Sequence, residues 1–116
     1  MEQTITVDLK WFRFSQNNSG GRFVTDDNVC EEVFVQARNA AEAIAKAEVF
    51  CDNSDSCPCC GDRWSFWVSD SDGTDEPMFY DEPVREAKKG MYRDKAILHH
   101  FDGRIETIEF ADKDAA

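Results

Sequence analysis

The stretch that decides the fold is NAAEAIAKAEVF, which runs from Asn39 to Phe50. Asn39 is a favoured N-cap residue, and Glu42 follows three residues later, as in a capping box. The apolar residues recur at helical spacing and share one stripe: Ala40, Ala43, Ile44, Ala47 and Phe50. The pattern predicts one amphipathic helix that packs its apolar stripe against the rest of the domain.

Strand patterns flank this helix. Residues 5–15 predict one strand of an antiparallel hairpin, and residues 22–25 and 29–36 predict the other, which is interrupted at 26–28. Residues 63–69 predict a short strand after the helix. In the first strand the apolar side chains change face between Trp11 and Phe12. This change indicates either a bulge or a strand that is buried on both faces.

The end of the chain predicts a second hairpin. Two apolar runs, Lys95–Phe101 and Arg104–Phe110, flank Asp102-Gly103, a dipeptide typical of two-residue hairpin turns. Pairing the strands around this turn places His99 opposite Glu106.

Together these elements predict an α+β fold. We expect a small, mostly antiparallel sheet with one main helix on one face, a C-terminal β-hairpin and a cysteine knuckle. The chain of 116 residues is long enough for one ordinary domain, which we place at residues 1–110, with a frayed tail at 111–116.

The composition excludes several classes of protein. Hydrophobic residues make up 41% of the chain, enough for a packed core, so wholesale disorder is excluded. A net charge of −11 disfavours binding to nucleic-acid backbones. We find no apolar stretch of membrane-spanning length and no signal region, so we expect a cytoplasmic protein without a membrane partner. The sequence is compatible with a homo-oligomer.

Five cysteines need an explanation, and three of them lie in the segment Cys57-Pro58-Cys59-Cys60-Gly61. Cys57 and Cys60 have the spacing of a zinc knuckle, in which two thiolates point at one ion. A tetrahedral site needs two further ligands, and our candidates are Cys30 and His99. The other residues available for this role are Cys51, Cys59 and His100. The sequence therefore predicts structural zinc, and the alternative is a set of buried, unliganded thiols.

A cysteine-dependent enzyme is a further alternative. A nucleophilic cysteine needs a histidine and an orienting acid, and His99 with Glu106 is the available pair. An ordinary cross-strand contact explains that pair as well. We find no motif of another enzyme class and expect a protein that is not an enzyme.

Arginines, tryptophans and amides gather around the polar segment Gln16–Gly21. Charge pairing, hydrogen bonding and ring stacking are what a small anionic ligand with a base requires. The simpler interpretation is a turn beside core tryptophans. The candidate ligand-binding residues are Trp11, Arg13, Gln16, Asn17, Asn18, Ser19, Arg22, Arg63 and Trp64.

Acidic residues are concentrated between Asp70 and Glu82. Such a run is usually a solvated loop. It is also compatible with a surface that imitates nucleic-acid phosphates and occupies a basic site on a partner protein.

Two segments carry a resemblance to a known family: FSQNNSGG at residues 14–21 and CPCCGDRW at residues 57–64. The chain resembles a family of short, largely uncharacterised bacteriophage proteins with these motifs, from about Trp11 to Phe110. Cys51 does not belong to the family pattern. The resemblance implies a phage accessory protein that acts in the cytoplasm of an infected bacterium, and it implies no particular activity.

Accessory proteins of this kind often counter host defences. We therefore expect a non-enzymatic protein that binds and sequesters a nucleotide-derived signal of host immunity. The alternatives are an acidic, nucleic-acid-mimicking inhibitor of a basic host protein and the cysteine-dependent enzyme.

Overall fold

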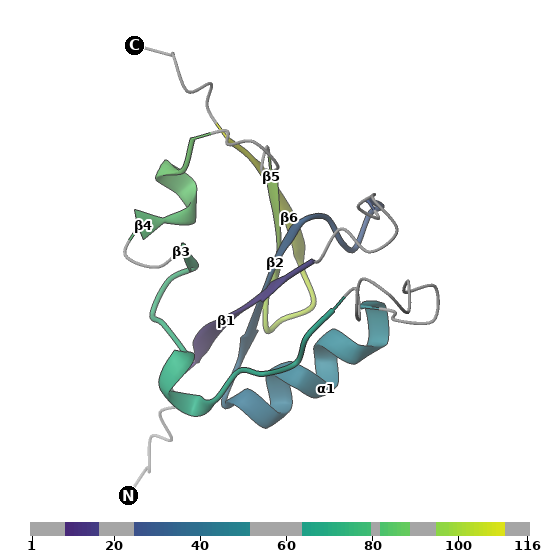
Figure 1. Ribbon diagram of the computed structural model, residues 1–116, viewed down its shortest axis with the longest axis vertical. Coiled ribbons are helices and arrows are strands. Elements are labelled where there is room, and N and C mark those ends of the chain that lie inside the picture. Colours follow the sequence, from purple (N-terminus) through teal and green to yellow (C-terminus); the bar gives the residue numbers. More distant parts are fainter. Residues whose placement is uncertain (1–8, 17–24, 52–63, 80–81, 89–94, 111–116) are drawn as a thin grey trace, which may run out of the picture.

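The computed structural model describes residues 9–16, 25–51, 64–79, 82–88 and 95–110 (Figure 1). Strand β1 pairs antiparallel with β2, and β5 pairs antiparallel with β6, whereas β2 and β5 run parallel. The resulting four-stranded sheet has the order β1-β2-β5-β6, with strands at Lys10–Ser15, Glu32–Ala37, Lys95–His99 and Ile105–Glu109. The predicted α+β fold, with its mostly antiparallel sheet and C-terminal hairpin, is confirmed. The predicted knuckle at Cys57 and Cys60 lies outside the described residues.

Helix α1 (Ala40–Phe50) has an N-terminus with two side-chain caps. As predicted, Asn39 Oδ1 accepts a hydrogen bond from the Glu42 backbone N–H at 2.8 Å. The Glu42 carboxylate bonds to the Arg38 backbone N–H and guanidinium rather than to the Asn39 backbone N–H of the expected capping box. Asp70 Oδ1 accepts from the Ala40 N–H at 2.8 Å. In the part of the chain that the structure describes, no helix is long and apolar enough to cross a membrane.

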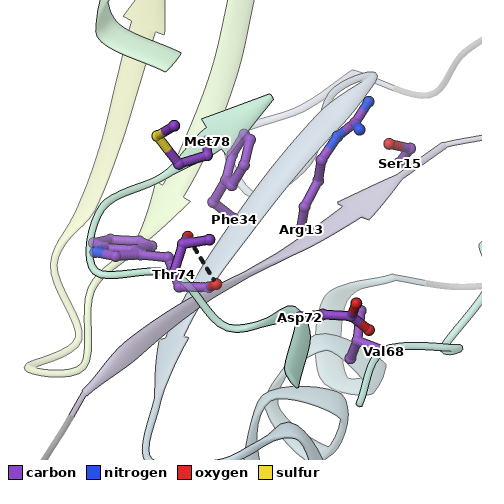
Figure 2. Close-up of a pocket in the computed structure, with 8 residues that line it drawn as sticks. Arg13, Ser15, Phe34, Val68, Asp72, Thr74 and Met78 are labelled. Carbon is purple, nitrogen blue, oxygen red and sulfur yellow. Dashed lines mark hydrogen bonds between the residues drawn. The ribbon is translucent and has the colours of Figure 1, made fainter. Parts of the chain in front are cut away.

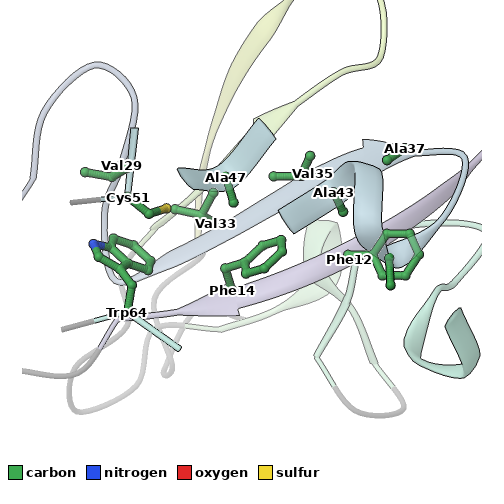
Figure 3. Close-up of a cluster of buried hydrophobic side chains, with 11 residues drawn as sticks. Phe12, Phe14, Val29, Val33, Val35, Ala37, Ala43, Ala47, Cys51 and Trp64 are labelled. Atoms are coloured by element: carbon green, nitrogen blue, oxygen red, sulfur yellow. The ribbon is translucent and has the colours of Figure 1, made fainter. Parts of the chain in front are cut away.

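One hydrophobic core lies between α1 and the sheet (Figure 3). Phe12 and Phe14 project from β1 into this core, and Trp64 covers one end of it with only 2% of its surface exposed. Alanines on the buried stripe of α1 let the helix approach the sheet closely, because they add little bulk at the interface. Its fully or partly buried stripe residues are those predicted: Ala40, Ala43, Ile44, Ala47 and Phe50.

A second core covers the opposite face of the sheet. The segment with β3 (Met78–Phe79), β4 (Glu82–Pro83) and the 3₁₀ turn η3 (Val84–Glu86) lies on this side of the sheet, away from α1 (Figure 1). The buried residues of this core are Trp11, Phe34, Val84, Ala87, Ala96, Leu98 and Phe110. Pairing between β1 and β2 is continuous, without a bulge. Burial on both faces therefore explains why the apolar pattern of β1 changes face.

The segment after Trp64 does not form the predicted strand. Trp64 makes an isolated bridge to Gln16, and the chain then continues without further strand pairing until Thr74 bridges to Trp11. The side chains of this segment still alternate as they would in a strand, because Trp67 is 89% exposed, whereas Trp64, Phe66 and Val68 pack against the core under α1.

At Gly73 this segment packs closely against side chains of β1. A Cβ atom at position 73 would lie 2.8 Å from Lys10 Cβ and 3.0 Å from Phe12 Cζ. Both contacts are too short for non-bonded carbons, so any larger residue at position 73 would push the segment away from β1.

The register predicted for the β5–β6 hairpin is wrong by one residue. His99 pairs with Ile105, and Glu106 pairs with Leu98. The His100 N–H bonds to the Arg104 carbonyl, which leaves a three-residue loop in which Gly103 adopts a φ of 93°. Three-residue hairpin loops place a residue in this left-handed region, where glycine is favoured. The sequence signal at Asp102-Gly103 thus gave the turn but not its length.

Because of this register, the predicted pair of His99 and Glu106 is also wrong. Glu106 accepts two hydrogen bonds from Arg85, at 2.8 and 3.0 Å, and its Oε1 lies 2.8 Å from His100 Nε2. The His100 ring in turn makes an edge contact with Trp11, with 5.1 Å between ring centroids. Glu106 thus links η3 to the hairpin. Hydrogen bonds from Arg85 and then His100 lower the pKa of Glu106 to about 2.

This lowered pKa predicts a defined pH dependence for Glu106→Gln. The folded protein holds the Glu106 proton more weakly than the unfolded chain, so ionised Glu106 stabilises the fold above about pH 4.5. We expect the variant to lose roughly 1 kcal/mol of unfolding free energy at pH 7, because the pair is partly screened by solvent. Between about pH 4.5 and pH 2 the difference should shrink as Glu106 becomes protonated.

Urea unfolding of both proteins at pH 7 and pH 3 measures this difference. Glu109→Gln, on the exposed part of the same strand, is the matched control and should change stability by less than about 0.5 kcal/mol. A Glu106→Gln difference that is equal at both pH values would contradict the assignment.

Candidate functional site: a cavity beside strand β1

A cavity of about 290 Å³ lies against the sheet face that is turned away from α1 (Figure 2). Strands β1 and β2 provide part of its wall. The rest comes from Met78 of β3 and from the crossing segment, residues 64–74, which runs along the outer edge of β1. Its lining combines aromatic, hydroxyl and charged side chains: Trp11, Arg13, Ser15, Phe34, Val68, Asp72, Thr74 and Met78.

The cavity follows from how the crossing segment meets β1. The segment is held at one end by the bridge between Trp64 and Gln16, and at the other by two backbone hydrogen bonds between Thr74 and Trp11, at 2.8 and 3.1 Å. Between the two bridges the segment advances by ten residues, from Trp64 to Thr74, whereas the strand it follows covers only five, from Gln16 to Trp11. The excess length must bow away from the strand, and Val68 and Asp72 of the bowed part become cavity wall.

Arg13 brings a positive charge to the cavity, but the charge is paired. Its Nε and Nη2 donate to the two carboxylate oxygens of Glu32 at 2.8 and 2.9 Å. Ser15 Oγ also donates to this carboxylate at 2.7 Å. The Glu32 side chain is only 6% exposed and that of Arg13 is 25% exposed, so this bidentate pair is strong and well ordered. The pair reduces the attraction of Arg13 for a ligand phosphate.

The structure brings two of the predicted ligand-binding residues, Trp11 and Arg13, to the cavity. Gln16 and Trp64 lie next to each other but elsewhere: Gln16 is buried with its Nε2 donating to the Cys30 carbonyl, and Trp64 belongs to the helix-side core. The remaining candidates lie outside the described residues: Asn17, Asn18, Ser19, Arg22 and Arg63.

Sequence reasoning missed six residues of the lining. Ser15 could have been found, because strand alternation places it on the same face as Trp11 and Arg13. The others lack a local signal, since they reach the cavity through long-range crossing of the chain: Phe34, Val68, Asp72, Thr74 and Met78.

The described cysteines are buried thiols. Cys30 Sγ lies 3.2 Å from the Glu32 carbonyl and 3.6 Å from the Lys95 carbonyl, which suits a protonated thiol donor. Burial raises the pKa of Cys30 to about 11 and that of Cys51 to about 12. Both thiols are protonated at neutral pH, whereas metal binding and nucleophilic attack need a thiolate.

His99 is the other described candidate for zinc binding. Its Nε2 lies 2.7 Å from the Asn28 carbonyl, and its ring stacks on Phe50 with 3.9 Å between centroids. Burial lowers the pKa of His99, so the imidazole favours the neutral form. Among the described residues there is no group of three or more His, Cys, Asp or Glu side chains that could hold a metal. Cys57 and Cys60 lie outside this part of the chain.

Three acids of the predicted acidic surface have partners within the chain. Asp70 caps α1, Asp72 Oδ2 accepts from the Ser69 N–H at 2.7 Å, and Asp75 pairs with Lys10. Asp70 and Asp72 belong to the 3₁₀ turn η2 (Asp70–Asp72). These carboxylates therefore stabilise the crossing segment, which explains part of the charge without a partner protein.

Comparison with known proteins gives a family for this chain. A family model described as a domain of unknown function, DUF7296, matches residues 9–116. The chain belongs to the DUF7296 family. The match includes every residue that the structure describes, so the DUF7296 domain comprises both cores and the cavity. No curated protein and no solved structure matches the chain.

The buried ion pair beside the cavity predicts a measurable coupling. Glu32→Gln leaves the Arg13 charge poorly compensated in a partly buried place, and we expect it to lower the unfolding free energy by about 2 kcal/mol. In a double-mutant cycle with Arg13→Gln, the coupling should be about 1–2 kcal/mol.

The more exposed pair Arg38–Glu42, at the N-terminus of α1, is the matched control, with an expected coupling of about 0.5 kcal/mol or less. Urea unfolding of both cycles gives the two values. Equal coupling energies for the two pairs would show that burial adds nothing to the Arg13–Glu32 interaction.

Proposed function

We propose that the cavity beside β1 is a ligand-binding site, and that the protein is a non-enzymatic bacteriophage accessory protein. In this proposal it binds and sequesters a nucleotide-derived signal of host immunity in the cytoplasm of the infected bacterium. The observation that supports binding is the meeting of Trp11 and Arg13, from β1, with Thr74 and Asp72, from the crossing segment, around one cavity. The combination of apolar side chains with placed polar groups is typical of small-molecule sites.

The size and charge of the cavity favour one part of such a ligand. Its volume of about 290 Å³ is near the lower end of the roughly 300–1,000 Å³ usual for ligand pockets. Glu32 neutralises Arg13, so the interior suits an uncharged planar ring better than a phosphate. The proposal therefore places the base in the cavity and the phosphate groups in solvent.

Binding is favoured over catalysis by the chemistry of the lining. Its described residues include no cysteine or histidine, and the described thiols, Cys30 and Cys51, are buried and protonated. The acidic-inhibitor alternative has less support, because Asp70, Asp72 and Asp75 serve local contacts.

The test is calorimetric titration with nucleosides, mononucleotides, ADP-ribose and cyclic dinucleotides. At least one of these probes should bind, and Ser15→Trp should weaken that binding by about tenfold or more, because an indole at this exposed position of the lining fills the cavity.

Ser71→Trp adds the same bulk to an exposed residue of η2 that does not line the cavity, and it should leave binding unchanged. The proposal fails if no probe produces heat, or if both variants affect binding equally.

Structural zinc is a separate proposal for the segment around Cys57 and Cys60. Their spacing is that of a zinc knuckle, with Cys30 and His99 as the proposed completing ligands. In that role Cys30 would have to lose its proton and its hydrogen bonds to carbonyl groups.

Metal analysis of the purified protein tests the zinc proposal. We expect one zinc ion per chain, which Cys57→Ser should remove and which Cys51→Ser, outside the knuckle, should retain. Retention of zinc by Cys30→Ser or His99→Gln would exclude that residue as a ligand, and a zinc-free wild-type protein would exclude the site.

A further inference from the structure

The polar groups that line the cavity differ in which of their hydrogen-bonding atoms already have a partner within the protein. Ser15 Oγ donates to Glu32, and Thr74 Oγ1 donates to the Glu76 carbonyl at 2.6 Å. Both carboxylate oxygens of Glu32 are bound to Arg13. Asp72 is different: its Oδ2 accepts from the Ser69 N–H and hydroxyl, while its Oδ1 accepts no hydrogen bond from any described residue. Because Asp72 lines the cavity and is exposed, this carboxylate oxygen is accessible to a ligand.

We propose that this site selects guanine, with the Asp72 carboxylate accepting hydrogen bonds from the guanine N1–H and N2–H₂ groups. The inference rests on the proposed function, because it names the base that the cavity receives. An ionised carboxylate only accepts hydrogen bonds, and one of its oxygens has two acceptor positions. Asp72 Oδ1 can therefore take both donors.

Guanine matches an acceptor-only group better than the other bases do. Its Watson–Crick edge presents two adjacent N–H donors. The amino group of adenine or cytosine adjoins a ring nitrogen acceptor, and the single ring N–H of uracil lies between two carbonyls. Each of these acceptors would face the carboxylate without a proton between them, which disfavours the wrong base through repulsion and desolvation.

The Asp72 carboxylate is held in place before a ligand arrives. The two hydrogen bonds from Ser69, at 2.7 and 3.2 Å, fix Oδ2 at the start of η2. The Asp70 bond to the Ala40 N–H attaches the same turn to α1. An acceptor that is already oriented loses little conformational entropy on binding, so its hydrogen bonds contribute more to affinity. In Figure 2, Asp72 lies beside Val68, and β1 passes between Asp72 and Phe34 of β2 in this view.

A neighbouring hollow indicates how the phosphate of a nucleotide would contribute. This more open space, of about 510 Å³, shares Thr74 and Met78 with the cavity and is also lined by Lys10, Asp75 and Glu76. Lys10 is paired with Asp75, so the local charge is negative. A phosphate gains nothing there, and guanosine should bind at least as tightly as its monophosphate.

Isothermal titration with guanosine, inosine, adenosine and GMP tests the inference. Guanosine should bind at least about tenfold more tightly than inosine, which lacks the N2 amino group. Its affinity should exceed that of adenosine by a larger factor. GMP should bind no tighter than guanosine.

Asp72→Asn replaces the carboxylate with a group that both donates and accepts, and retains an oxygen for the Ser69 bonds. It should reduce guanosine affinity by about tenfold while leaving adenosine affinity within about twofold. Asp75→Asn, which alters a carboxylate outside the cavity lining, is the matched control and should retain the preference.

The outcomes separate this inference from the proposed function. If adenosine binds as tightly as guanosine and Ser15→Trp weakens both, the guanine assignment is overturned and the binding site stands. If no nucleoside or nucleotide binds, both are overturned. If guanosine is preferred but Asp72→Asn leaves the preference intact, Asp72 is not the selecting group.

Discussion

Burial of β1 on both faces is the constraint on which the rest of the structure depends. Phe12 and Phe14 fill the core under α1, while Trp11 belongs to the core on the opposite face. A strand that serves two cores at the edge of a sheet needs cover along that edge. The segment from Trp64 to Thr74 gives that cover by bridging to both ends of β1, and the cavity lies where it bows away between the bridges.

Local sequence signals predicted the elements but not the crossings between them. The cap at Asn39 and the apolar stripe gave α1, and the face change at Trp11 allowed the doubly buried strand as one of two explanations. The Asp102-Gly103 dipeptide predicted the turn with a register one residue off, because hairpin loops of two and of three residues both favour glycine at such a position. The position of Asp72 beside β1 depends on a crossing between distant segments, and no local pattern encodes it.

The net charge of the chain does not describe the charge around the cavity, because many of the charged side chains there are paired. A net −11 suggests a surface that repels polyanions. Much of the described acidic run holds the crossing segment in place, through contacts with the N-terminus of α1, with Ser69 and with Lys10. The predicted cationic character at Arg13 is cancelled by Glu32. The candidate site is thus governed by hydrogen-bond direction more than by net charge, which favours recognition of a base over recognition of a phosphate.

The Asp70 cap has a consequence for the motions of the protein. The backbone N–H of Ala40, at the first position of α1, has no acceptor within the helix, and Asp70 Oδ1 takes this role. That amide can exchange its hydrogen with solvent only when the turn η2 moves away from the helix. The hydrogen-exchange rate of the Ala40 amide therefore reports how often η2, which carries Asp72 of the cavity wall, moves away from α1. Ala40 itself does not line the cavity.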